Sequence, residues 1–241
     1  MTTPDLPVPG RNPIEVAGRL RAVAALPILR IVNAVPPQYR TGRVDTFWVG
    51  NPETREYARV EAVLRWVSPH AYWYVERGVD VRQEAIERAA AAFEDTVYPT
   101  VQRYFGVEPT PGVDNDPRIT ILNARLAGAA GYFSSVDLYH RVVHPYSNER
   151  EMLYLNAPTV APGSQAYLGV LAHEFQHLVH ARANPFEETW VKEGAAELAR
   201  HLLNPDASAR PAAFQLQPDI QLTSWADQPQ LALAHYDAAF L

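Results

Sequence analysis

His173, Glu174 and His177 lie within five consecutive positions, in the stretch LAHEFQHLVH. On an α-helix, residues four apart lie on one face about one turn apart, so the two imidazoles can bind one metal ion together. Glu174 points about a hundred degrees around the helix, where its carboxylate can reach a water beside the metal. The flanking residues are apolar, and burying these polar groups without a purpose is costly. The pattern therefore predicts a zinc-hydrolase site rather than a helix with structural histidines.

A zinc hydrolase needs a third protein ligand and keeps one position open for water. A histidine six residues after His177, as in the metzincins, is excluded because Ala183 occupies that position. His180 follows on the same helix, but one straight helix cannot easily wrap three ligands around one ion. For His180 we expect a surface position or a supporting hydrogen bond.

Two glutamates downstream, in the stretch WVKEGAAELA, are better candidates for the third ligand. Glu193 follows His177 after one loop through Asn184-Pro185, and Glu197 lies four residues further on, on the same helix face. One of the two carboxylates can bind zinc while the other accepts a hydrogen bond from a ligating histidine. The alternative interpretation is a solvated helix face.

These two segments together resemble the gluzincin arrangement, in which a glutamate on the next helix completes His-Glu-x-x-His. The sequence is most similar to the hyicolysin-like secreted bacterial metallopeptidases, over roughly residues 95–241. The upstream segments that share this likeness read GVDNDPRITIL, GYFSS and NEREMLYLN.

The resemblance implies His173, His177 and Glu193 as ligands of Zn²⁺, Glu174 as general base, and Glu197 as the partner of a ligating histidine. It also implies a tyrosine or histidine that stabilises the oxyanion. The candidates are Tyr236 and His235 in the stretch AHYDAAFL, of which we prefer Tyr236.

The expected activity is that of a zinc-dependent endopeptidase acting on a peptide or protein substrate. An extracellular location is implied by the resemblance alone, because the first ten residues, MTTPDLPVPG, lack the pattern of a signal peptide. The alternative is a catalytically silent relative that acts as a surface binding module, and the intact Glu174 argues against it. A deformylase-like enzyme is disfavoured because that chemistry normally adds a cysteine ligand and the chain has no cysteine.

Composition is that of an ordinary globular protein. The 241 residues are 47% apolar and 20% charged, with a formal net charge of -6. Because no run of lysine or arginine forms a basic stripe, we expect neither nucleic acid nor an anionic membrane as a partner. No apolar stretch approaches the length of a bilayer span.

The first half of the chain predicts a helix, three strands and a second helix after an extended tail over residues 1–12. Asn12 and Pro13 are typical of a helix start. β-Branched and aromatic residues separated by turn signals predict strands within 43–51, 56–68 and 70–78. The second helix is expected from Asp80 as cap to Gly106 as terminator, kinked or split at Pro99.

The second half predicts short strands within residues 112–124, 128–135 and 151–157, followed by helices over 164–182 and 188–204. The fold class expected is α+β. A zincin-like domain over residues 80–241, with a small mixed sheet over the active-site helix, follows an antiparallel β unit over 43–79 and an N-terminal tail and short helix over 1–42. The apolar stretch LALAHYDAAFL at the end suggests a chain cut from something longer.

Three weaker signals leave two interpretations each. Asp114 and Asp116 are candidates for a Ca²⁺ site, although an Asx-turn is the commoner explanation. The segment 128–135 is either a sheet edge that holds substrate or an ordinary turn and strand. The tryptophans at positions 48, 66 and 73 form a ligand platform or, more simply, pack a small sheet.

Overall fold

The computed structural model describes residues 12–20, 30–51, 54–204, 212–225 and 229–240. The extended tail expected at the N-terminus falls, up to residue 11, outside these ranges. The helix expected after it is confirmed as α1, Pro13–Leu20. The Asn12 side chain accepts hydrogen bonds from the N–H groups of Ile14 and Glu15, as a helix cap does.

All six strands belong to one mixed sheet with the order β1-β2-β3-β4-β6-β5. The first three strands pair antiparallel, β3–β4 and β4–β6 pair parallel, and β5 pairs antiparallel with β6. Every strand predicted from the sequence is therefore present. The strand bounds are Val44–Gly50 (β1), Tyr57–Val67 (β2), Ala71–Glu76 (β3), Ile119–Ala124 (β4), Gly131–Phe133 (β5) and Met152–Asn156 (β6).

The three antiparallel strands expected over 43–79 do not form a sheet of their own. Strand β3 pairs in parallel with β4, with Ala71 opposite Ile119 and Val75 opposite Asn123. The three antiparallel strands and the parallel strands therefore belong to one sheet. The overall class is consistent with the α+β expectation.

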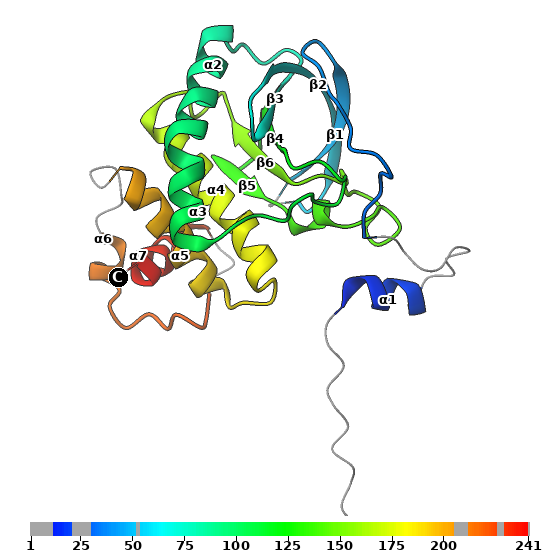
Figure 1. The fold of residues 1–241 in the computed structure, drawn as a ribbon. Coiled ribbons are helices and arrows are strands. Elements are labelled where there is room, and N and C mark those ends of the chain that lie inside the picture. The colour runs from blue at the N-terminus through cyan, green and yellow to red at the C-terminus, as the bar shows by residue number, and fades with distance from the viewer. Residues whose placement is uncertain (1–11, 21–29, 52–53, 205–211, 226–228, 241) are drawn as a thin grey trace, which may run out of the picture.

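The sheet is curled (Figure 1). A hydrophobic core lies on each of its faces. One face packs on helices through residues such as Trp73, Ile121 and Leu153. The other face lines the inside of the curl with residues such as Tyr74 and Tyr154. Alternation along each strand sends neighbouring side chains to opposite faces, which explains how adjacent residues enter different cores.

The second predicted helix forms in three parts, α2 (Gln83–Ala92), a π-helical turn η1 (Phe93–Val97) and α3 (Tyr98–Phe105). Pro99 lies in the first turn of α3, where its missing N–H costs least, and the wider π turn precedes it. Gly106 ends α3 with a φ of 99°, as expected. The prediction that Asp80 caps this helix is wrong. The N-cap is Arg82, in extended backbone and without a side-chain cap bond, because the helix starts two residues later than its polar flank suggests.

Helices α4 (Gln165–Ala183), α5 (Thr189–Leu203), α6 (Ala212–Leu216) and α7 (Pro229–Phe240) follow the sheet. Ser164 caps α4 by accepting a hydrogen bond from the N–H of Tyr167, 3.2 Å away. The helices α4 and α5 pack together, and α7 packs on α5. Within the described ranges, every helix is too short or too polar to cross a bilayer.

Candidate metal centre

Helix α4 presents His173 and His177 on one face, one turn apart. Their Nε2 atoms lie 3.1 Å from each other, and the two rings meet nearly at right angles, with centroids 4.7 Å apart. Apolar residues on the rest of the helix, including Leu171, Phe175 and Leu178, are fully buried in the core. Core packing thus fixes the rotation of α4 and turns both imidazoles toward one point.

Helix α5 brings Glu193 to the same point. Its Oε2 atom lies 3.3 Å from Nε2 of His173 and 3.4 Å from Nε2 of His177. These three side chains are the group of metal-ligating residues that the described part of the chain brings together, with one ligand atom from each lying within 4.8 Å of the others. The structure therefore joins the three residues that the sequence proposed as metal ligands.

Glu197, one turn after Glu193, contacts the other side of the His173 ring. Its Oε1 atom is 3.0 Å from Nδ1 of His173, and Nη1 of Arg200 lies 3.6 Å from the same oxygen. A carboxylate at Nδ1 fixes the tautomer that leaves Nε2 free to bind a metal, and it makes the imidazole more basic.

The electrostatics of this cluster reflect close pairing of acids with imidazoles. Burial lowers the pKa of His173, but the adjacent carboxylates of Glu193 and Glu197 outweigh it and raise this pKa to about 10. Burial opposes ionisation of Glu193 and of Glu197, yet the neighbouring histidines, above all His173, hold both pKa values below their usual range. Both carboxylates are therefore ionised at neutral pH, as metal ligation and hydrogen bonding to a ligand require.

Glu174 lies beside the cluster but has a different environment. It is only 7% exposed, and burial raises its pKa, although His173 and His177 pull in the opposite direction. Strand β5 comes so close that a Cβ added at Gly131 would lie 3.4 Å from Cγ of Glu174 and 2.6 Å from Cγ1 of Val170. A raised pKa is what a carboxyl group needs in order to take up and return a proton near neutral pH.

Tyr236, on α7, lines the same cleft. Its ring centroid is 6.4 Å from that of His173, and its ring packs edge-on against Trp225, 5.0 Å away. Burial, together with the carboxylates of Glu193 and Glu174, raises the pKa of the Tyr236 hydroxyl, which therefore keeps its proton and can donate it. His235, the other candidate, is buried at the preceding position of α7; it also packs against Trp225 but does not line the cleft.

The cleft over the metal-ligating group has a volume of about 340 Å³. Ser135, Asn184 and Lys192 also line it, and sequence reasoning did not single out Ser135 or Lys192. Lys192 precedes Glu193 directly, so its position next to a predicted ligand was the available signal. Ser135 follows β5, and only the fold shows that this strand crosses α4.

The remaining candidates do not join the cluster. Nδ1 of His180 lies 3.3 Å from Nε2 of Gln176, and His180 is not among the residues that line the cleft over the ligating pair. Asp114 Oδ1 accepts a hydrogen bond from the N–H of Asp116, which is an Asx-turn. Asp116 accepts from the N–H of Arg118 and from the Tyr72 hydroxyl. The two carboxylates are thus engaged by the chain, as the simpler of the two interpretations predicts.

Comparison with known proteins supports a metallopeptidase relationship. No model of a known protein family matches the chain. The neutral metalloprotease ShpI of Staphylococcus hyicus is 26% identical over 181 residues, which covers 66% of this chain. The chain spans 40% of the length of that relative. The His/His/Glu group is the feature of the structure that agrees with this relationship, because its ligand atoms lie close enough together to hold a metal ion.

Proposed function

We propose that this chain is a zinc-dependent endopeptidase of gluzincin type with a zincin-like catalytic domain. The observation that carries the proposal is the convergence of two imidazole nitrogens and one carboxylate oxygen beside the buried carboxyl group of Glu174. The residues of the cleft and of the cluster all lie within residues 80–241, which supports the assignment of the catalytic domain to this part of the chain.

The residues present fit a zinc ion. Tetrahedral ligands at the usual zinc bond lengths of ~2.0–2.1 Å stand about 3.3–3.4 Å apart. The separations of the donor atoms of His173, His177 and Glu193 are 3.1, 3.3 and 3.4 Å. Oε2 of Glu193 is also buried without a well-aligned hydrogen bond from any residue in the described ranges. A buried anionic oxygen in that state is stabilised by a cation.

A zinc ion held by His173, His177 and Glu193 would supply Lewis acidity, which would polarise the peptide carbonyl and lower the pKa of an adjacent water toward about 7. Glu174 accepts a proton from that water as its oxygen attacks the carbonyl carbon. The same carboxyl group then gives the proton to the leaving amine as the C–N bond breaks. Glu197 keeps the His173 ring in its orientation, and the Tyr236 hydroxyl donates a hydrogen bond to the oxyanion that develops on the carbonyl.

Strand β5 is the part of the fold that suits an extended peptide. It is the last strand of the sheet order, it pairs only with β6 among the described strands, and Gly131–Phe133 lines the cleft. An added peptide strand would hydrogen-bond to its free edge beside Glu174. The similarity to a neutral metalloprotease supports peptide as substrate, and the extracellular location remains a proposal that rests on the resemblance.

Metal analysis and casein cleavage test this function together. The zinc-loaded chain should hold about one zinc per chain, and it should cleave casein until a chelator removes the metal. His173→Ala should abolish both properties. His180→Ala is the matched control, since it removes a histidine from the same helix without touching the cluster. Zinc bound equally by His173→Ala, or zinc bound without any cleavage, contradicts the proposal.

A further inference from the structure

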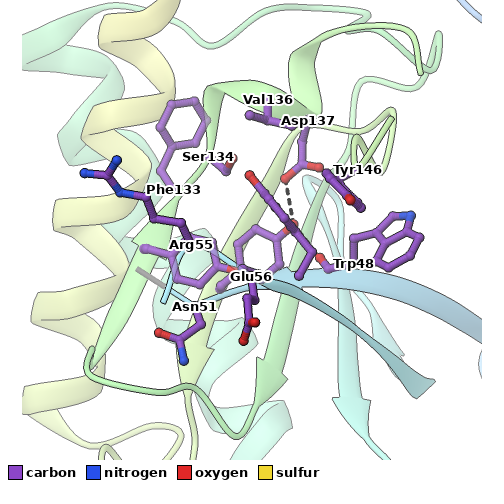
Figure 2. Close-up of a pocket in the computed structure, with 13 residues that line it drawn as sticks. Trp48, Asn51, Arg55, Glu56, Phe133, Ser134, Val136, Asp137 and Tyr146 are labelled. Atoms are coloured by element: carbon purple, nitrogen blue, oxygen red, sulfur yellow. Dashed lines mark hydrogen bonds between the residues drawn. The ribbon is translucent and has the colours of Figure 1, made fainter. Parts of the chain in front are cut away.

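A second cavity, of about 420 Å³, shares part of its lining with the catalytic cleft. Figure 2 shows the residues that line this cavity. Tyr132 and Phe133 of β5 line both spaces. After β5, Ser134, Val136 and Asp137 line the cavity, whereas Ser135 lines the cleft. The segment from Tyr132 to Asp137 is therefore a thin wall between the cavity and the metal centre.

The curl of the sheet creates this cavity. Trp48 of β1 exchanges two backbone hydrogen bonds with the side chain of Asn148, at 2.8 and 2.9 Å. The N–H of Gly50 donates to the Tyr132 hydroxyl at 3.0 Å. These bonds join the first strand of the sheet to its opposite edge. They also engage backbone groups of β1 that would otherwise pair with another strand.

Two stacked pairs of tyrosine rings line the cavity. Tyr57 stacks on Tyr146 with centroids 4.3 Å apart, and Tyr132 stacks on Tyr154 with centroids 4.2 Å apart. Trp48 meets Tyr146 edge-on at 5.1 Å. Aromatic faces carry negative charge density and attract lysine and arginine side chains, more strongly where water is excluded.

A buried acid completes the cavity. The Asp137 carboxylate points inward among the rings in Figure 2 and is 2% exposed. It accepts hydrogen bonds from the N–H of Asn148 at 2.7 Å and from the Tyr154 hydroxyl at 2.6 Å, and both donors are uncharged. The charge of Arg141 lowers the pKa of Asp137, but the exposed guanidinium of Arg141 contacts Glu149 and the carbonyl of Ser147.

No ion pair joins Asp137 to a basic side chain among the residues that the structure describes. Arg55 also lines the cavity, together with the opposite charge of Glu56. Burial raises the pKa of Asp137 to about 7, so an arriving cation would favour its ionised form. Aromatic walls and an uncompensated acid are two independent features, and both favour the same ligand chemistry, a positive charge on an extended stem.

The alternation of β5 connects this cavity to substrate. Phe133 packs with the core on the helix side, and Tyr132 packs with the core inside the curl. A peptide strand added to β5 follows the same alternation, so its successive side chains point to the metal side and to the cavity side in turn. If one side chain of the bound peptide points to the metal side, the next side chain along the peptide therefore points toward the aromatic cavity.

We propose that the aromatic cavity is a specificity pocket for a basic side chain of the bound peptide, arginine above lysine. The planar guanidinium group can stack on the tyrosine rings and form a forked ion pair with Asp137. This proposal rests on the proposed peptidase function, because it takes the occupant from a peptide held along β5.

The test is a set of quenched fluorescent peptides in which each position near the cleaved bond is set in turn to arginine, lysine, leucine, phenylalanine, alanine or glutamate. At one position, arginine should raise kcat/KM about tenfold over alanine, lysine should raise it less, and glutamate should lower it. Asp137→Asn and Tyr146→Ala should each bring the ratio of arginine to alanine close to one. Tyr146 is 39% exposed, so its truncation tests the pocket even if Asp137→Asn does not fold.

Tyr104→Ala is the matched control, because Tyr104 is 57% exposed on α3 and does not line the cavity. It should keep the full preference for arginine. The absence of a basic preference at every position, a preference for leucine or phenylalanine that Tyr146→Ala removes, or a basic preference that survives both variants overturns the proposal.

A binding measurement separates this proposal from the peptidase function. Calorimetric titration of zinc-loaded Glu174→Gln with the arginine peptide and with its alanine counterpart should show tighter binding of the arginine peptide. Tyr146→Ala in the same background should remove the difference. If no peptide is hydrolysed but this difference is present, the peptidase proposal fails and the basic pocket stands. If peptides are hydrolysed and the difference is absent, the pocket fails alone.

Discussion

At the scale of single residues, the centre is a set of five side chains with different electrostatic environments. His173 and His177 converge with Glu193 through Nε2 atoms and one oxygen, and Glu197 lies on the opposite nitrogen of His173. Glu174, one residue from His173, is instead a buried carboxyl group beside β5 and has a raised pKa. Three glutamates can therefore have three different roles, as metal ligand, as partner of a ligating histidine and as proton acceptor, because their positions differ.

The two acids of α5 should differ in their effect on zinc. Glu193→Ala should abolish zinc binding, since it removes one of the three converging atoms. Glu197→Ala removes only a partner of Nδ1 and should weaken zinc binding roughly ten- to a hundred-fold. Competition with a chromophoric chelator measures both affinities. The reverse order would show that Glu197 is the ligand.

Part of this centre could be predicted from sequence. The spacing of His173 and His177 on a helix suffices to place them on one face, and the downstream glutamates follow from the next helix. The different roles of Glu193 and Glu197 could not be derived from spacing, because both lie on one face and only the packing angle of α5 on α4 decides which carboxylate faces Nε2. The aromatic cavity was also beyond sequence reasoning, since Trp48 and Asn148 meet across a hundred positions.

At the scale of elements, small residues set how closely the catalytic helices approach. A Cβ added at Gly194 of α5 would lie 2.3 Å from the carbonyl oxygen of Ala239, so α5 and α7 touch backbone to backbone there. Gly194 follows Glu193, and Ala239 lies one turn after Tyr236. This contact therefore fixes the distance between the third metal-ligating residue and the proposed oxyanion donor.

Gly194→Ala should separate the two helices. Because the obstacle is backbone, we expect a loss of about 1–3 kcal/mol in the free energy of unfolding and about a tenfold loss in kcat/KM, with zinc still bound. Denaturant unfolding, zinc analysis and peptide hydrolysis measure the three effects. Gly169→Ala on α4 is the matched control, because its Cβ meets only the flexible Arg200 side chain, at 3.3 Å. An equal effect of both changes would show that the contact with α7 is unimportant.

Periodicity and turn residues predicted the strands and helices well, because these signals act over a few neighbouring residues. The start of α2 at Arg82 and the π turn before Pro99 were missed, since both depend on how the helix packs and not on its own sequence. Parallel pairing of β3 with β4 joins segments more than forty residues apart, and no local pattern encodes it.

At the scale of the whole molecule, a pair of buried acids, Asp114 and Glu151, lies in the segments that lead into β4 and β6. Glu151 is 3% exposed, accepts hydrogen bonds from the N–H of Val113 and lies against Gly112. Burial raises the pKa of Glu151 to about 8 and that of Asp114 to about 6. The folded chain thus holds protons that the unfolded chain releases at lower pH.

Stability should therefore fall as pH rises. A folded-state pKa above the unfolded value means that the folded chain binds more protons between the two, so the free energy of unfolding decreases across that window. For Glu151 the window runs from its ordinary value of 4.5 to about 8. Across this window, the free energy of unfolding of Glu151→Gln should fall by at least about 1 kcal/mol less than that of the wild-type chain. Urea unfolding at several pH values measures both. Glu61→Gln, at an exposed ion pair with Arg77, is the control and should leave the pH dependence as it is.

The central claim is that a metal-assisted proton transfer through Glu174 cleaves peptide bonds. It is tested most directly by comparing peptide hydrolysis by the wild-type chain and by Glu174→Gln at equal, measured zinc content. The account predicts about one zinc per chain in both proteins, and a fall in kcat of roughly 10²- to 10⁴-fold on Glu174→Gln. Equal rates in the two zinc-loaded proteins, or no hydrolysis by the zinc-loaded wild type, would contradict it.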